Sequence, residues 1–231
     1  ALSHGQNERL RDTIAWSWSR LEPWVRSAVA QLSVFRGSFD LEAADAALCL
    51  DAWPEAPWIG EVVGVLLQHS LVQSHDDRVR FSLYEAVREF AVNTRTGPTA
   101  STRVRLRLAQ WYAPLGSLIA KDRTDQATAE ARARLAADLD HVLDSIEAAI
   151  AAQRADLAGP CAVGALAGLS DCGPFERGVA LCLKAADMPD QSNILRLEVL
   201  RRVGVLLAWE GKQAQGMTIL EQAVEEASSE G

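Results

Sequence analysis

The stretch that decides the fold of the first part of the chain is Leu71-Val72-Gln73-Ser74-His75-Asp76-Asp77-Arg78-Val79-Arg80-Phe81-Ser82-Leu83. Two short runs rich in apolar residues flank four polar residues, 75–78, of the kind that form turns. In the second run Val79, Phe81 and Leu83 alternate with polar residues, as one buried face of a strand does. The stretch therefore predicts a β-hairpin.

Helical periodicity surrounds this hairpin on both sides. The helices expected before it run from Asn7 to Ser19, from Pro23 to about Leu32, from Leu41 to Leu48 with Asp40 as the cap, and from Pro57 to about His69. The helix expected after it carries Leu83, Val87, Phe90 and Ala91 on one stripe. Several short helices, a two-stranded wing and a closing helix predict a winged helix-turn-helix domain over residues 1–98.

The pattern changes at Gly97-Pro98-Thr99, and residues 99–231 have helical periodicity throughout. A weak internal repeat lies near the end of this part. Gly173, Gly178, Cys182 and Ala185 recur, with the same spacing, as Gly211, Gly216, Leu220 and Ala223. The offset of 38 residues (173 to 211) is slightly longer than the 34 of a tetratricopeptide repeat. The sequence thus predicts a mainly α protein, whose second domain is an antiparallel helical-repeat arm of tetratricopeptide (TPR) type.

Small residues let the helices of such a repeat approach each other closely. The glycines expected to pack between repeat helices are Gly173, Gly178, Gly204, Gly211 and Gly216.

Three groups of residues carry a resemblance to a known family. The segments 10–19, 32–39 and 41–44 resemble the region that follows the nucleotide-binding domain in bacterial STAND-class (NB-ARC-like) signalling ATPases. The segment 81–91 resembles the wing strand and closing helix of that region, and Leu139-Asp140-His141-Val142-Leu143 resembles the start of the arm that follows.

The resemblance implies a regulatory module and not an enzyme. An upstream P-loop domain would bind ATP or ADP, the winged helix would help to hold the ADP-bound resting state, and the arm would receive a signal or a protein partner. Many members of the family are transcriptional regulators. Two alternatives remain: a stand-alone TPR-like scaffold for protein–protein interaction and, less favoured, a DNA-binding transcription regulator.

The same resemblance singles out the end of the wing. In the family, Met-His-Asp often ends the wing strand, and its histidine contacts the nucleotide phosphate. Leu83-Tyr84-Glu85 stands at this place here, so the residues that would face a nucleotide in the partner domain are Tyr84 and Glu85. A tyrosine can still donate a hydrogen bond, but it carries no positive charge near neutral pH.

The chain contains no G-x-x-x-x-G-K-[ST] motif, so the ATPase domain itself is absent and no cofactor site is expected. No catalytic constellation and no metal-ligand spacing occurs either. The four cysteines stand apart among aliphatic residues and are expected to be buried free thiols. Glu85 with Glu89 is expected on a solvated or interdomain helix face, and Asp138, Asp140 and Asp144 on a solvated face.

Two further groups have a predicted role. Trp53 and Trp58 flank a proline-rich loop and form a candidate docking surface. Three arginines of one helix are expected to form ion pairs with acidic residues of the next helix, such as Glu130 or Asp138; they are Arg103, Arg105 and Arg107.

The charge of the chain argues against a nucleic acid as its main partner. The net charge is −8, and Glu61 is the only charged residue between Trp58 and His69, where a recognition helix is expected. No apolar run approaches the length of a membrane span. The N-terminus has neither an initiator Met nor a signal-peptide core, so we expect a piece of a longer cytoplasmic protein.

Overall fold

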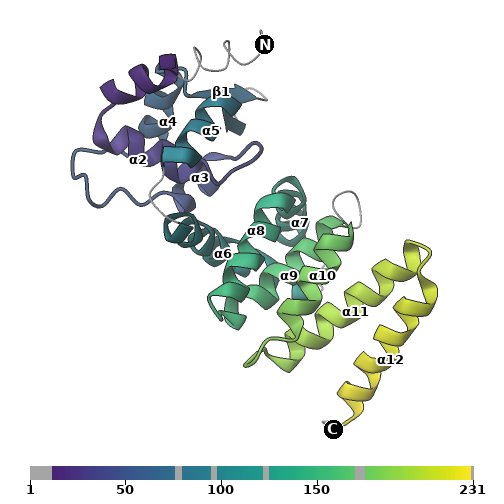
Figure 1. The fold of residues 1–231 in the computed structure, drawn as a ribbon. Coiled ribbons are helices and arrows are strands. Elements are labelled where there is room, and N and C mark those ends of the chain that lie inside the picture. Colours follow the sequence, from purple (N-terminus) through teal and green to yellow (C-terminus); the bar gives the residue numbers. More distant parts are fainter. Residues whose placement is uncertain (1–11, 76–79, 95–97, 122–124, 170–174, 230–231) are drawn as a thin grey trace. The chain divides into compact units, whose positions relative to one another are not determined.

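The computed structural model describes residues 12–75, 80–94, 98–121, 125–169 and 175–229. The chain divides into two compact units, residues 1–104 and 105–231. The described residues are mainly helical with one two-stranded antiparallel hairpin, which confirms the predicted mainly α class (Figure 1). The division falls inside α6 (Pro98–Ala120), a few residues after the break expected at Gly97-Pro98.

The first unit contains the predicted elements in the predicted order. They are a helix over residues 12–20, α2 (Pro23–Leu32), α3 (Leu41–Ala47), α4 (Ile59–Gln68), β1 (Val72–His75), β2 (Arg80–Leu83) and α5 (Glu85–Thr94). Helix α4 begins at Ile59, with Trp58 as its N-cap, so it starts two residues later than Pro57. Residues 7–11 of the first predicted helix and residues 76–78 of the predicted turn lie outside the described residues, and His75, predicted to begin that turn, is the last residue of β1.

Local chemistry explains where these helices begin and which faces they bury. Pro23 occupies the first turn of α2, where no N–H is needed, and the buried face of that helix includes Val25 and Val29. The Asp40 carboxylate accepts a hydrogen bond of 2.7 Å from the backbone N–H of Ala43 and so caps α3 as predicted. Trp18 lies 5.4 Å from the ring of Phe90, which packs the helix over residues 12–20 against α5.

The hairpin pairs Val72 with Leu83 at one end and His75 with Arg80 at the other. A third extended segment joins it, because Phe39 and Phe81 exchange backbone hydrogen bonds of 2.8 and 2.7 Å. Phe81 and Leu83 are both buried, as their alternation predicted, whereas Val79 lies outside the described residues. Strand β2 is therefore bonded on one edge to β1 and on the other to the segment before α3.

The second unit is built of helices. After α6 come α7 (Gln126–Ala137), α8 (Leu139–Ala151), α9 (Ala155–Leu169), α10 (Phe175–Ala186), α11 (Asn193–Trp209) and α12 (Gln213–Ser229). From α8 onward each helix packs on the next, and α9 also contacts α7 and α11 (Figure 1). The core of this unit includes Leu108 and Tyr112 of α6 and Leu143 and Ile146 of α8.

One crossing in this unit leaves no room for a side chain. A Cβ added to Gly116 in α6 would lie 1.9 Å from the carbonyl oxygen of Pro160 in α9. A Cβ added to Gly164, one turn further along α9, would lie 3.4 Å from the Cα of Gly116. The backbones of α6 and α9 are thus in direct contact, and glycine is what permits it.

Candidate functional site

Tyr84 lies at the junction between β2 and α5. Its backbone N–H donates to the Leu71 carbonyl at 3.3 Å, and its own carbonyl accepts from the N–H of Arg88 at 2.9 Å, so it occupies the N-cap position. The side chain of Tyr84 is 42% exposed, whereas the preceding Leu83 is buried. The chain therefore turns from the core to the surface at this point and presents one hydroxyl donor beside a helix N-terminus.

Glu85 occupies the first turn of α5, next to Tyr84. Its carboxylate is paired with Arg88 in a two-pronged contact, with 2.8 Å between Nε of Arg88 and Oε2 of Glu85. The Arg88 hydrogen bond holds the pKa of Glu85 below its ordinary value, so the carboxylate stays charged. A negative charge here stabilises the helix N-terminus and opposes a second anion. Of the two predicted residues, Tyr84 is the one suited to donate to an anion.

The two tryptophans of the predicted docking surface have different surroundings. Trp58 is 65% exposed, and its indole N–H donates to the Glu61 carboxylate at 2.7 Å. Its ring lies over Gly60, where an added Cβ would come within 2.1 Å of it. Trp53 is half-buried within a turn. Trp58 therefore exposes an aromatic ring at the start of α4 whose orientation is fixed by the hydrogen bond to Glu61. Trp53 exposes less of its side chain.

Gly204 in α11 and Gly216 in α12 face each other. A Cβ on Gly204 would lie 2.6 Å from Cγ of Leu220 and 3.0 Å from the carbonyl oxygen of Gly216. A Cβ on Gly216 would lie 2.6 Å from the carbonyl oxygen of Gly204. Gly178 in α10 is similarly tight against Leu169, and Gly173 lies outside the described residues.

Gly211 has another role than the packing predicted for it. A Cβ at this position would meet nothing within 4 Å, but the backbone has φ of +81°, which favours glycine. The N–H of Lys212 donates to the Leu207 carbonyl at 2.9 Å and that of Gly211 to the Ala208 carbonyl at 3.2 Å. This is the Schellman pattern of a helix C-terminus, so Gly211 ends α11 and reverses the chain into α12.

A groove of about 510 Å³ lies between α10 and α12. Its apolar lining is Phe175, Val179, Ala180, Leu183, Leu207 and Ile219, and its polar lining is Glu176, Lys212, Gln215 and Thr218. Lys212 reaches across the groove, with 3.3 Å between its Nζ and Oε1 of Glu176 and 5.3 Å to the ring centroid of Phe175. The groove is suited to an apolar side chain and has charge of both signs at its edge.

Among the described residues there is no cluster of three or more side chains that could hold a metal ion. No helix in the described part of the chain is both long and apolar enough to cross a membrane. Comparisons with protein-family models, curated proteins and solved structures found no match. The function of the chain is therefore inferred from its own residues.

Two carboxylates expected on a solvated face are buried, and here the sequence-based prediction is wrong. Asp138 accepts a hydrogen bond of 3.2 Å from the Tyr112 hydroxyl. Asp144 is paired with Arg177 at 2.9 Å and with Arg105 at 3.4 Å, so it joins α6, α8 and α10. Arg105 was expected to pair with an acidic residue such as Glu130 or Asp138, but it pairs with Asp144 in α8. Only Asp140 of the three is exposed.

The cysteines also depart in part from expectation. Cys161 and Cys182 are buried, and burial raises the pKa of both thiols, that of Cys182 to about 12. Cys49 is exposed instead, with its thiol 3.4 Å from the Asp51 carboxylate. Cys172 lies outside the described residues. The two buried thiols are therefore inert core side chains at neutral pH.

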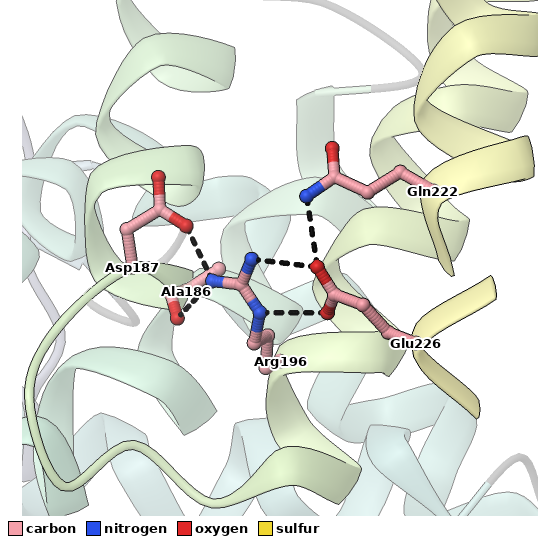
Figure 2. A network of polar contacts seen from close by, with 5 residues as sticks. All are labelled: Ala186, Asp187, Arg196, Gln222 and Glu226. Atoms are coloured by element: carbon pink, nitrogen blue, oxygen red, sulfur yellow. Dashed lines mark hydrogen bonds and ion pairs between the residues drawn. The ribbon is translucent and has the colours of Figure 1, made fainter. Parts of the chain in front are cut away.

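Arg196 ties three helices together near the end of the chain (Figure 2). It donates to both Glu226 carboxylate oxygens at 2.9 and 3.0 Å, to the Ala186 carbonyl at 3.1 Å and to Asp187. Gln222 donates to the same Glu226 carboxylate at 2.9 Å. The network joins the end of α10 and the start of α11 to α12, so it fixes the relative position of these helices.

This network predicts a pH dependence of stability. The Arg196 hydrogen bond, with that of Gln222, lowers the pKa of Glu226 from 4.5 to about 2. A lowered carboxylate pKa gives stability that is present above the unfolded pKa and is lost as the pH falls through the folded pKa. Because the pair is partly exposed, we expect Glu226→Gln to lower the free energy of unfolding by about 0.5 kcal/mol at pH 7. Near pH 2 the two proteins should be equally stable. Urea unfolding of both forms between pH 7 and 2 measures this; a difference constant with pH would contradict it.

Proposed function

We propose that this chain is a non-catalytic regulatory segment of a larger STAND-type ATPase of the bacterial cytoplasm. Its first unit is a winged-helix domain that contacts an upstream nucleotide-binding domain, and its second unit is a TPR-like arm. When a protein partner or a signal molecule binds to the arm, the winged-helix domain passes this change on to the upstream nucleotide-binding domain. ATP or ADP belongs to the upstream domain and not to this chain.

The observation that carries the proposal is the order of elements in the first unit. Helix α2 is followed by the extended segment at Phe39, then by α3 and α4, then by the β1–β2 hairpin. Phe39 pairs with β2, which makes a small three-stranded arrangement beside three helices. This is the order in which a winged helix-turn-helix domain places its strands and helices. In the STAND family such a domain follows the nucleotide-binding domain, and Tyr84 then stands where a nucleotide-facing residue is expected.

The arm supports the proposal less specifically. Helices α9 to α12 pack each on the next, and Gly204 and Gly216 bring α11 and α12 into backbone contact. Such close antiparallel pairs are typical of helical-repeat arms that present surfaces to proteins.

The second candidate function is a stand-alone interaction scaffold. The groove between α10 and α12 favours it, because its lining is largely apolar and a protein side chain would fit. The two functions differ in what surrounds this chain in its natural protein: a P-loop domain immediately upstream favours the relay, and its absence favours the scaffold.

A DNA-binding role is the third candidate, and we expect it to fail a direct test. Helix α4, which would enter the groove of DNA, carries no Lys or Arg, and the chain has a net charge of −8. Affinity for DNA depends on basic side chains at phosphates and therefore falls with salt. Fluorescence anisotropy with a labelled duplex should show no salt-sensitive binding, and a signal that falls steeply from low to moderate salt would overturn this expectation.

Nucleotide binding tests where the ATP site lies. The chain has no phosphate-binding loop, so calorimetry should detect no tight binding of ATP or ADP to the isolated 231-residue chain. The longer natural protein should bind both. Binding of ATP to the isolated chain with a Kd of about 1 μM or better, equivalent to about −8 kcal/mol, would contradict the proposal.

Tyr84→Ala tests whether the end of the wing faces nucleotide. The side chain is exposed, so its removal should leave the melting of this chain unchanged. In the natural protein it should weaken ADP retention by about 0.5–1.5 kcal/mol, the value of one neutral hydrogen bond. The measurement is the ADP dissociation rate, with Glu221→Ala, at an exposed residue of α12, as the control. An unchanged rate would remove the role given to Tyr84.

A further inference from the structure

Helices α9 and α10 form one pair in the arm, and helices α11 and α12 form a second, equivalent pair. The 38-residue offset of the sequence repeat relates the first residue of α9, Ala155, to the first residue of α11, Asn193. The same offset relates Phe175, which begins α10, to Gln213, which begins α12. Both pairs therefore start in the same register, and each residue of α10 has an equivalent in α12.

Helix α10 shows how the first pair receives the second. Val179 is buried and lines the groove between α10 and α12. Glu176 is paired with Lys212 at 3.3 Å, in the connection that leads into α12. Asp187, directly after α10, is paired with Arg196 of α11. The side of α10 that meets the second pair is thus apolar with acidic residues near both ends, and the second pair supplies the basic residues.

The equivalent side of α12 is exposed. Met217, the equivalent of Val179, is 54% exposed, and Val224, the equivalent of the buried Ala186, is 66% exposed. The two exposed residues lie about two helical turns apart and on one stripe. Single exposed apolar residues are ordinary on a protein surface, but these two stand where the first pair has buried residues.

The charge of this side is repeated as well. Glu225, the equivalent of Asp187, is exposed, and α12 contains neither Lys nor Arg. On α10 the basic residues come from the second pair, so a helix that covers α12 in the same way has to bring its own. We call Met217, Val224 and Glu225 the outer face of α12.

We propose that the outer face of α12 binds an amphipathic helix of a partner protein, one that carries Arg or Lys beside its apolar stripe. The apolar stripe would cover Met217 and Val224, and a basic side chain would pair with Glu225, as Arg196 pairs with Asp187. The inference names the kind of partner that the arm receives, so it rests on that part of the proposed function. It does not involve the nucleotide.

Charge also argues against a second copy of this chain as the occupant. Two outer faces placed together would bring Glu225 of each copy toward a helix that has no basic residue to pair with it. Like charges at an interface disfavour the complex, whereas a basic helix is complementary to this face.

Fluorescence anisotropy with a labelled designed peptide and the whole chain tests the proposal. The peptide is a helix of about 18 residues, or five turns, with leucine along one face and arginine beside it. A second peptide has glutamate in place of each arginine. We expect the arginine peptide to bind with a Kd of about 100 μM or below, and the glutamate peptide to bind at least tenfold more weakly.

Variants of exposed residues locate the site. Val224→Ser and Glu225→Lys should each weaken binding of the arginine peptide about tenfold, and Glu225→Lys should strengthen binding of the glutamate peptide. Glu55→Lys, at an exposed residue of the first unit, is the matched control, because it changes the net charge by the same amount and should alter neither affinity. Thermal melting without peptide confirms that each variant is folded.

Absence of binding by the arginine peptide at about ten times the expected Kd would contradict the proposal, and so would equal binding of both peptides. Binding that persists in folded Val224→Ser and Glu225→Lys proteins would place the helix elsewhere. Self-association of the free chain that Val224→Ser abolishes would assign the outer face to a second copy and overturn the proposal. Since no nucleotide is present, these results are independent of the ADP measurements that test the proposed relay.

Discussion

Gly116→Ala should destabilise the helical arm by about 3 kcal/mol, although it adds only one methyl group. The new Cβ would lie 1.9 Å from the Pro160 carbonyl oxygen and 2.6 Å from its carbonyl carbon. Both atoms belong to the backbone of α9, so no side chain can rotate away, and the two helices must separate. Their separation would also disturb the contact between Gly164 and Leu135. Urea unfolding followed by circular dichroism measures the loss.

Gly64→Ala is the matched control, because Gly64 also lies within a helix but has nothing within 4 Å of an added Cβ. Alanine is favoured over glycine in a helix by about 0.5–1 kcal/mol, so this variant should be as stable as the natural sequence or slightly more so. Equal stability of the Gly116→Ala and Gly64→Ala proteins would show that α6 and α9 are not in backbone contact.

Gly204→Leu should destabilise the α11–α12 pair by about 1–3 kcal/mol through overpacking. The first carbon of the new side chain would lie 2.6 Å from Cγ of Leu220 and 3.0 Å from the carbonyl oxygen of Gly216. Leu220 could shift, but the Gly216 backbone could not without moving α12. Because Arg196 also joins these helices to α10, the separation would strain that network as well.

Met217→Leu supplies the control for this variant. Met217 follows Gly216 in α12 and is more than half exposed, so leucine there should change the unfolding free energy by less than about 0.5 kcal/mol. A Gly204→Leu protein that melts with the same midpoint as Met217→Leu would contradict the close packing of α11 on α12 and the repeat register based on it.

Much of the first unit could be predicted from sequence because its signals are local. Alternation at Phe81 and Leu83 predicted β2, Pro23 predicted the start of α2, and Asp40 predicted the cap of α3. The backbone pairing of Phe39 with Phe81 was not predicted, because it joins residues that are far apart in the chain and no local pattern specifies the partner.

The polar interactions of the arm were harder to predict for the same reason. A charged side chain on a helix is usually solvated, and the pairing of Asp144 with Arg105 and Arg177 depends on how three helices meet. Asp138 did carry a signal, since it lies three residues after Leu135 and four before Val142, on a buried stripe. Gly211 was predicted to pack between helices but instead ends α11 with a positive φ. The spacing of glycines in a sequence cannot distinguish a glycine that lets two helices approach closely from one that is needed for a positive φ.

The dissociation rate of ADP from the longer ATPase that we propose contains this chain tests the central claim most directly. The intact protein is compared with a form from which residues 1–231 of this chain have been deleted. If this segment helps to hold the ADP-bound resting state, ADP should leave the deleted form at least tenfold faster, which corresponds to about 1.4 kcal/mol of stabilisation. Equal dissociation rates for the two forms, or an intact protein that holds no nucleotide, would contradict the claim that the chain regulates an ATPase.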